Sequence, residues 1–262
     1  MNEVVTERLS LENSLRLAIE RGEFVLYYQP QIDINTNTLI GVEALIRWNH
    51  PQNGLISPAK FIPVAEDTGL IIPIGEWVLR EVCQQHFKWV NFGLPRIQIA
   101  VNVSAIQFQE KQFLFMLQEI FKNYNMNPAY MELELTEGIL MKNANAATKE
   151  LHLLKELGVK LSIDDFGTGY SSLQYLSQFP IDKLKIDQTF IRTMVTHSSS
   201  LAIVESIASL ADKLHIKVIA EGVESNEELK ILQKCGCNEV QGYFFAKPLP
   251  ADKFVEWYYA KF

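Results

Sequence analysis

Polar side chains whose oxygens can bind a cation stand at the ends of most short apolar runs in this sequence. Strand interiors disfavour Asp, Asn and Glu, so their recurrence there indicates a chemical role. Carboxylates and an amide carbonyl, with no His or Cys among them, suit Mg²⁺ or Mn²⁺ better than Zn²⁺. The pattern therefore predicts a site for hard divalent cations. The acidic and amide residues are Glu43, Asn102, Glu134, Glu137, Asp164, Asp165, Asp187, Glu221, Glu224 and Gln241, and the basic residues Arg47 and Lys185 stand among them.

The two-residue period of a strand assigns several of these side chains to one face. Glu43, Leu45 and Arg47 share a face in this way. Carboxylates that converge on one mouth repel one another unless divalent cations are bound. A single acidic residue at a strand end is more often a solvated or helix-capping group, but a series at consecutive strand ends favours the metal site. Asp164-Asp165 is the strongest single case, because adjacent carboxylates can serve two neighbouring metals.

Strands that alternate with helices must carry these residues. Two β-rich runs, 24–34 and 39–48, predict an antiparallel hairpin. The strands expected after it are 97–103, 131–136, 160–165, 183–187, 216–221 and 239–243. The helices expected are 11–21, 57–69, 73–90, 105–123, 145–157, 201–214 and 227–234, the last with a capping box at Ser225 and Glu228.

This alternation predicts the fold class. Strands separated by helices pair in parallel, and about eight strands are enough to close a barrel. We therefore expect an α/β fold, a modified TIM (β/α)8 barrel whose first strand runs antiparallel to its neighbours. The active site of such a barrel is built at the carboxyl ends of the strands, where the polar residues fall.

Length and charge narrow the classes of function. The 262 residues carry no Gly/Ser/Pro-rich linker, so one domain is favoured. A formal net charge of −7 gives no positive field for a polyanion, which disfavours polymeric nucleic acid as a partner. A phosphorylated substrate would have to be neutralised by bound cations instead.

Cysteine usage and hydropathy predict a cytoplasmic protein. Cys83, Cys235 and Cys237 form no C-x-x-C pair and are read as buried thiols of a reducing compartment. No apolar run is long enough for a membrane helix, and the first residues lack the regions of a signal peptide. The five histidines show no metal-binding spacing, and no Walker-type or G-x-G-x-x-G loop follows a strand.

A set of short motifs, in order and spacing, resembles the EAL-domain cyclic di-GMP phosphodiesterases over roughly residues 11–249. Any one of these motifs is a weak signal, whereas the ordered set is specific. The motifs are Tyr28-Gln29-Pro30, Glu43-Ala44-Leu45, Asn102-Val103-Ser104, Glu134-Leu135-Thr136-Glu137, Asp164-Asp165-Phe166-Gly167-Thr168-Gly169, Lys185-Ile186-Asp187, Glu221-Gly222-Val223-Glu224 and Gln241-Gly242.

The resemblance implies two divalent cations, Mg²⁺ or Mn²⁺, and a set of catalytic residues. It implies that Glu43, Asn102, Glu134 and Asp164 bind one metal, and that Asp164, Asp165 and Glu221 lie around the second. Lys185 would hold the attacking water. Glu221 would be a metal ligand, a general base or both. The catalytic set that follows is Lys185, Glu221, Glu43 and Asp164.

The resemblance also implies substrate contacts and a dimer. Glu137 would brace the loop at 165–173, which in the family couples the site to a dimer interface, and Glu224 is placed in the same loop-stabilising group. We therefore expect a homodimer. Gln29, Leu45, Arg47 and Gln241 would contact cyclic di-GMP, with Glu66 and Tyr243 near guanine or ribose.

The implied reaction agrees with the chemistry of the residues. Hydrolysis of a phosphodiester needs a strong nucleophile at neutral pH, and a water bridging two metals roughly 3.5–4 Å apart supplies one. The expected reaction opens cyclic di-GMP to linear pGpG. Two alternatives remain: a non-catalytic cyclic di-GMP receptor, and a metal-dependent barrel enzyme for another phosphorylated metabolite.

The expected layout is one phosphodiesterase domain over residues 1–262. Residues 1–22 form a linker-like N-terminal helix, 23–250 the barrel core and 251–262 a C-terminal helix. The opening helix resembles the linker that follows a sensory or diguanylate-cyclase-like domain in longer family members. We therefore expect a domain excised from a multidomain signalling protein.

Overall fold

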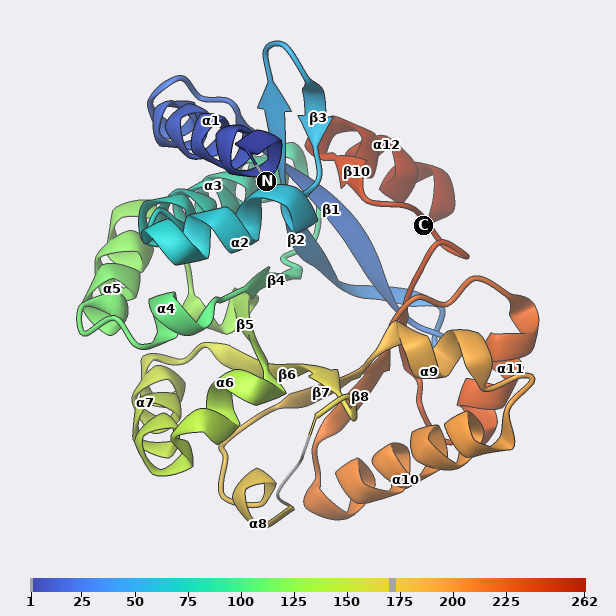
Figure 1. Cartoon of the computed structure of the whole chain (residues 1–262). Helices are drawn as coiled ribbons and strands as arrows, with labels where there is room; N and C mark the ends of the chain where they lie inside the picture. The colour runs from blue at the N-terminus through green and yellow to red at the C-terminus, as the bar shows by residue number, and fades with distance from the viewer. Residues whose placement is uncertain (1, 170–172) are drawn as a thin grey trace.

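A closed barrel of eight strands forms the centre of the computed structural model (Figure 1). The structure describes residues 2–169 and 173–262, and for residues 2–10 it describes the backbone only. The sheet contains ten strands in the order β10-β1-β9-β8-β7-β6-β5-β4-β2-β3, and pairing of β1 with β2 closes it. β3 (Gly54–Ile56) and β10 (Leu249–Pro250) extend its edges. The barrel strands are β1 (Phe24–Asp33), β2 (Thr38–His50), β4 (Gln98–Asn102), β5 (Met131–Thr136), β6 (Lys160–Phe166), β7 (Lys183–Ile186), β8 (Lys217–Ala220) and β9 (Glu239–Gln241).

β1 is the antiparallel strand of the barrel. It pairs antiparallel with β2 and with β9, whereas the other barrel strands, β2 and β4 through β9, pair in parallel with their barrel neighbours. The prediction of a modified (β/α)8 barrel with an antiparallel first strand is therefore confirmed. The register sets Gln29 opposite Glu43 and Gln31 opposite Gln241, so polar residues of three strands become lateral neighbours.

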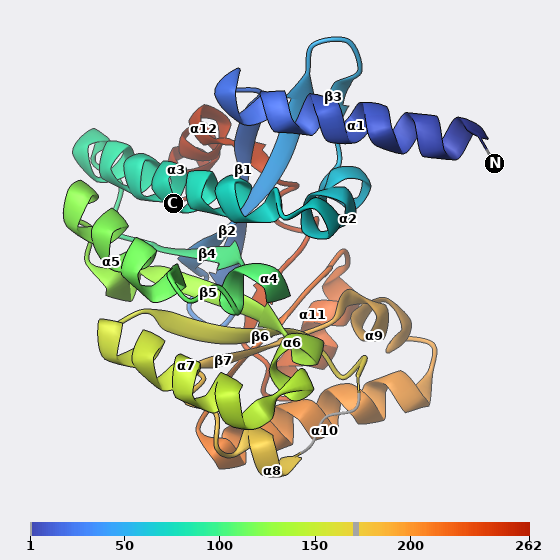
Figure 2. The same cartoon turned by 60° about the vertical axis from the view of Figure 1, so that its left-hand side comes forward.

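Helices surround the barrel, with α3, α5, α7 and α10 in an outer layer (Figure 2). Ser57 stands at the N-cap of α2 with Pro58 at its first position, and the capping box at Ser225 begins α11, both as predicted. The long helices are α1 (Asn2–Glu20), α2 (Pro58–Thr68), α3 (Ile71–Phe92), α5 (Phe113–Tyr124), α7 (Ala144–Leu157), α10 (Ser198–Leu214), α11 (Asn226–Lys234) and α12 (Ala251–Lys261). The short ones are α4 (Ala105–Phe108), α6 (Glu137–Lys142), α8 (Leu173–Leu176), α9 (Gln188–Thr193) and the 3₁₀ turn Pro128–Tyr130.

One predicted helix, 105–123, is in fact two. α4 ends at Phe108 and α5 begins at Phe113, with no Gly or Pro between them to signal the break. Both phenylalanines are buried in the same core. Five residues apart on one continuous helix they would point about 140° away from each other, so burying both requires the interruption.

The barrel is apolar outside and polar inside. Leu133 of β5, Ile163 of β6 and Leu184 of β7 are buried against the helices. Their neighbours along each strand point into the barrel, where a TIM barrel ordinarily packs branched apolar side chains. The polar inner faces therefore mark the interior of the barrel as the candidate functional region.

Above the mouth, a second apolar cluster holds α1 and α2 on the extended end of β2. Trp48, Phe61 and Leu15 are fully buried there, and the ring centroids of Phe24 and Trp48 lie 6.1 Å apart.

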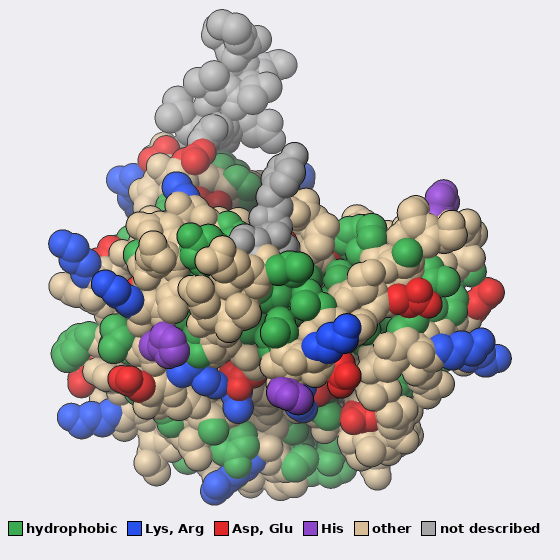
Figure 3. All heavy atoms as spheres, turned by 90° about the horizontal axis from the view of Figure 1, so that it is seen from below, with side chains coloured by type: hydrophobic (Ala, Val, Ile, Leu, Met, Phe, Trp, Pro, Cys, Tyr) green, Lys and Arg blue, Asp and Glu red, His purple; other side chains and the backbone are tan. Residues whose placement is uncertain are grey.

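Within the described residues, no helix is both long and apolar enough to cross a bilayer. Acidic and basic side chains are interspersed on the face shown in Figure 3.

Candidate active site

Lys185 stands at the centre of the carboxylates that β2, β5, β6 and β8 bring to the mouth. Its Nζ lies 2.7 Å from Glu134 Oε2, 2.7 Å from Glu221 Oε1, 3.1 Å from Asp164 Oδ1 and 3.8 Å from Glu43 Oε1. The residue is 1% exposed. Burial alone would lower the pKa of Lys185, but the surrounding carboxylates, Asp164 foremost, raise it well above its usual range.

Glu43 is fixed by two amide side chains, one from the adjacent strand β4 and one from β9. Asn102 Nδ2 donates to its Oε1 at 2.7 Å, and Gln241 Nε2 donates to its Oε2 and to Gln29 Oε1. Burial alone would raise the pKa of Glu43, but Lys185 and these hydrogen bonds hold it below its usual range. Because the amide nitrogen of Asn102 is engaged, its carbonyl oxygen is the atom available to a cation.

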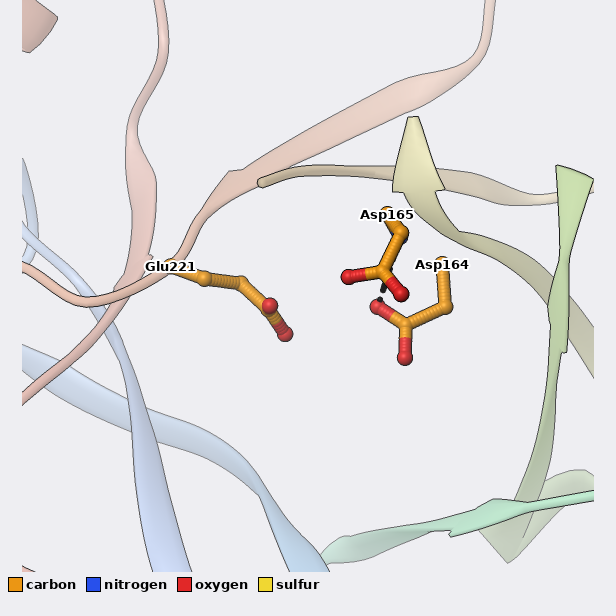
Figure 4. Close-up of side chains that lie close together, drawn as sticks. All are labelled: Asp164, Asp165 and Glu221. Atoms are coloured by element: carbon orange, nitrogen blue, oxygen red, sulfur yellow. Dashed lines mark hydrogen bonds between the residues drawn. The ribbon is translucent and has the colours of Figure 1, made fainter. Parts of the chain in front are cut away.

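Asp164, Asp165 and Glu221 form a compact group of carboxylates. One oxygen of each lies within 4.8 Å of the other two, and the three side chains point toward one another in Figure 4. Burial and repulsion from Asp164 raise the pKa of Asp165 to about 6, and burial, opposed by Lys185, raises the pKa of Glu221 to about 8. These groups repel one another, and a cation between them would relieve the repulsion.

An irregularity in β6 brings two adjacent aspartates to the same mouth. Consecutive residues of a regular strand point to opposite faces. Here the register between β6 and β7 shifts between Ile163 and Phe166, and Asp165 adopts a left-handed φ of 54° while its amide donates to Asp164 Oδ1 at 3.0 Å. Such strain in a non-glycine residue persists where surrounding structure enforces it, commonly at functional sites.

The donor set fits divalent cations. Glu134 is 1% exposed, its Oε1 has no hydrogen-bond partner among the described residues, and burial with the nearby Glu43 raises its pKa well above the usual range. Every candidate ligand is oxygen, the preference of Mg²⁺ and Mn²⁺. Five carboxylates around the single Lys185 ammonium leave four formal negative charges, which two divalent cations would balance.

A cavity of about 660 Å³ adjoins this site. It is lined by Leu45 and Asn102 together with Pro58, Ile62 and Glu66 of α2. The three helix residues are four apart in sequence, so they share one helix face. Pro58 and Ile62 were not among the predicted substrate residues, although this spacing from Glu66 could have identified them.

The other expected substrate residues differ in their burial and in their hydrogen-bond partners. Gln29 is buried and donates to the carbonyl of Ala246, so its side chain forms part of the inner wall of the barrel. Arg47 is half-buried, donates to the carbonyl of Ile46 at 2.8 Å and lies with its guanidinium 5.9 Å from the ring of Tyr27. Tyr243 is exposed.

Glu137 and Glu224, the two glutamates expected to stabilise loops, differ in their surroundings. Glu137 is 3% exposed, and neither of its carboxylate oxygens has a partner within the part of the chain that is described. A Cβ added at Gly169 would lie 3.0 Å from Glu137 Oε1, so the start of the 165–173 loop passes directly over it. Residues 170–172 of that loop lie outside the described residues. Glu224 is exposed and accepts from Arg192 at 3.3 Å.

Gly242 explains the Gln-Gly pair that follows β9. A Cβ at this position would meet Val223 O at 2.1 Å and Val223 N at 2.3 Å, so only glycine allows the two backbones to approach. The amide of Val223 donates to the carbonyl of Gln241 at 3.1 Å. This contact ties the segment after Glu221 to Gln241, on which Glu43 depends.

The closed mixed barrel and its carboxylate-rich mouth define a class of protein: modified (β/α)8 barrels that present an oxygen-ligand site at the carboxyl ends of their strands. Comparison with known sequences narrows the class, because the family model of the EAL domain matches residues 12–248. The chain belongs to the EAL domain family.

Two curated relatives and one solved structure support this family membership. The bifunctional diguanylate cyclase/cyclic di-GMP phosphodiesterase MucR of Pseudomonas aeruginosa is 44% identical over 97% of this chain and 37% of its own length. The cyclic di-GMP phosphodiesterase PdeR of Escherichia coli is 42% identical over 98% of this chain and 39% of its own length. A structure of the PaMucR phosphodiesterase in complex with c-di-GMP has a TM-score of 0.91 at 44% identity, covering 94% of this chain and 99% of that one. The chain thus spans under two fifths of these curated relatives, which are larger proteins.

Proposed function

We propose that this chain is a phosphodiesterase that hydrolyses cyclic di-GMP to linear pGpG with two divalent cations, Mg²⁺ or Mn²⁺. The observation that carries the proposal is the gathering of Asp164, Asp165 and Glu221 around Lys185 at the barrel mouth. Relatives named as cyclic di-GMP phosphodiesterases at 42–44% identity support the choice of substrate. Every position of the expected catalytic set is occupied by a residue able to do its part.

The cations would be held by the mouth carboxylates. Glu43, Asn102, Glu134 and Asp164 would hold one, and Asp164, Asp165 and Glu221 the other. Bound there, they would activate water and neutralise the phosphodiester. The unpaired Oε1 of Glu134 and the mutual repulsion around Asp164 support this assignment.

Lys185 and Glu221 would act on the attacking water. The ammonium of Lys185 lies within hydrogen-bond distance of Glu221 and Asp164, so it can donate to and orient a water held between them. Glu221 would serve as a cation ligand, as the acceptor of the water proton, or as both. No side-chain nucleophile is required by this arrangement.

The substrate would extend from the mouth into the neighbouring cavity. Leu45, Pro58 and Ile62 offer an apolar wall to a guanine base, and the Glu66 carboxylate can accept from its ring N–H and amino groups. Arg47 would contact a phosphate and Tyr243 the ribose or base. Gln29 and Gln241 would act mainly by holding Glu43.

Two glutamates beside the site would stabilise loops. We propose that Glu137 braces the 165–173 loop and that Glu224 supports the neighbouring loop with Arg192. From the resemblance to the family, we also propose that the active form is a homodimer. We further propose one phosphodiesterase domain (linker-like helix 1–22, barrel 23–250, C-terminal helix 251–262) within a longer cytoplasmic signalling protein. Cys83 and Cys237 are buried free thiols and Cys235 is half-buried, which agrees with a reducing compartment.

One experiment decides between catalysis and binding alone. The protein is incubated with cyclic di-GMP and Mn²⁺ or Mg²⁺, and the products are separated by chromatography, with an EDTA-treated sample as control. We expect pGpG in the cation samples alone. Cyclic di-GMP binding with no pGpG would establish the receptor, and turnover of other phosphorylated metabolites but not cyclic di-GMP would establish the third alternative.

A further inference from the structure

A second set of buried charges lies inside the barrel beneath the mouth. Glu132, Lys183 and Glu239 each precede a mouth residue by two positions on β5, β7 and β9, so they share its inward face. They are 1%, 4% and 7% exposed. Lys183 Nζ lies 3.1 Å from Glu132 Oε2 and 3.3 Å from Glu239 Oε2. We call these three residues the base layer.

A small residue makes room for the bridge from β7 to β5. β6 lies between these strands, and Ser162 is the register partner of Lys183 on β6. Ser162 is 1% exposed and its Oγ has no hydrogen-bond partner among the described residues. Ser162 therefore contributes by being small, because a larger side chain at this position would obstruct Lys183.

The other lysines at this end of the barrel are already engaged. Lys217 Nζ lies 2.7 Å from Glu239 Oε1, with its side chain 70% exposed. Lys160, the register partner of Glu132, has its Nζ 3.1 Å from Asp182 Oδ1. Within the described residues, the ion pair recorded for Glu132 is the one with Lys183.

Loss of Lys183 would therefore leave a buried carboxylate without a counter-ion, which is strongly unfavourable. The side chain best placed to replace it is Lys185, two residues further along the same face of β7 and about 6.6 Å away along the strand. Lys185 would then turn from Glu221 and Asp164 toward Glu132. Glu134, which contacts Lys185 now, lies directly on this path.

We propose that Lys183 is a positioning residue, which neutralises Glu132 and thereby keeps Lys185 directed at the carboxylates of the mouth. The kinetic consequence rests on the proposed function, whereas the position of Lys185 and the affinity for Mn²⁺ do not. Lys183 lies beneath the site, where its ammonium pairs with Glu132 and Glu239.

The test compares Lys183→Met with the double variant Glu132→Gln/Lys183→Met. In Lys183→Met, kcat for cyclic di-GMP should fall at least about tenfold, as for other changes behind a metal site. Mn²⁺ affinity, measured by calorimetry, should stay equal or rise, because an ammonium has left the mouth. A crystal structure should show Lys185 Nζ displaced toward Glu132. The double variant removes both charges, and its kcat should return to within about threefold of wild type.

Lys217→Met is the matched control, since it removes an exposed lysine from Glu239 and should change neither kcat nor Mn²⁺ affinity. Parallel losses of kcat and Mn²⁺ affinity in Lys183→Met would show that the whole site has become disordered, and would overturn the proposal. A crystal structure of this variant in which Lys185 has not moved would also overturn it. If Lys183→Met does not fold, the double variant decides, because a folded double variant that stays tenfold slow overturns neutralisation as the role. Wild type that makes no pGpG would refute the proposed function, while the Mn²⁺ titration and the position of Lys185 would still test this inference.

Discussion

Lys185 Nζ lies 2.7 Å from Glu221 Oε1, although Lys185 is on β7, Glu221 directly follows β8, and the two residues are 36 positions apart. The adjacent parallel strands β7 and β8 bring their carboxyl ends together, and the backbone amide of Glu221 donates to the carbonyl of Ile186 at 3.2 Å. This contact defines the centre of the site.

Replacing Lys185 by Met should remove turnover but keep substrate affinity. The ammonium would orient the attacking water and not the cyclic dinucleotide, so kcat should fall by about 10²–10⁴-fold, the usual range for a positioned proton-transfer group. KM for cyclic di-GMP should change little. Steady-state kinetics check this, with the exposed Lys213→Met as control. A rise in KM alone would move Lys185 from the water to the phosphate.

Asp164→Asn should abolish tight cation binding. Asp164 is the one carboxylate assigned to both cations, and changes merely behind a metal site already cost about 10–100-fold in affinity. Calorimetric titration with Mn²⁺ should show an affinity at least about 100-fold weaker than wild type. Asp252→Asn on the exposed start of α12 is the control. Unchanged Mn²⁺ affinity in Asp164→Asn would disprove the ligand assignment.

Ile62→Trp should fill part of the cavity beside the mouth. Ile62 lines that cavity with Leu45 and Glu66, so the larger ring should exclude the base and raise KM for cyclic di-GMP about tenfold, the cost of roughly 1.4 kcal/mol of lost binding. Mn²⁺ affinity should not change. Ile203→Trp, on an exposed position of α10, controls for the substitution itself. An unaltered KM would place the base elsewhere.

Gly242→Ala should destabilise the fold and the site together. The new methyl group would overlap the backbone of Val223, and overpacking of this kind costs about 1–3 kcal/mol or more. Thermal unfolding should show a lower Tm than wild type. Gly138→Ala is the matched control, because nothing lies within 4 Å of its Cβ and alanine favours the helix α6. Equal Tm values for the two variants would contradict the close approach.

Asp182 should stabilise the fold in a pH-dependent way. Burial would raise its pKa, but hydrogen bonds from Lys155, the Leu161 amide and Lys160 prevail and lower it. A lowered folded-state pKa gives stability that is full above the unfolded value of about 3.9 and is lost as pH falls through the folded pKa. Denaturant unfolding of Asp182→Asn should show a deficit of about 1–3 kcal/mol at pH 7. The deficit should shrink toward pH 3, and one independent of pH would contradict the ionic role.

Much of the fold and of the donor set could be read from local pattern. The alternation of β-rich and helical segments predicted the closed barrel, because strand and helix periods are properties of short stretches of chain. The polar residues at consecutive strand ends predicted an oxygen-rich mouth, because parallel strands necessarily bring their carboxyl ends to one edge. Asn102, Asp164 and Glu221 follow from this rule, whereas Glu43 lies in the interior of β2 and was predicted from its face and from the resemblance.

Other features depend on contacts between segments far apart in the chain. The bulge that turns both Asp164 and Asp165 to the mouth arises from pairing with β7, and the break between α4 and α5 arises from burial of two phenylalanines in one core. The cavity wall at Pro58 and Ile62 exists because α2 packs beside β2. Periodicity cannot show such packing.

The sequence by itself determined which side chains are available: oxygen ligands and one central lysine, carried on a parallel barrel with an antiparallel first strand. Only the tertiary structure decided how charge is distributed inside it. Closure of the barrel stacks Lys183 with Glu132 beneath Lys185 with its carboxylates, because residues two apart on a strand face the same interior. The net negative charge is therefore concentrated at the mouth, where divalent cations and a phosphodiester can meet it.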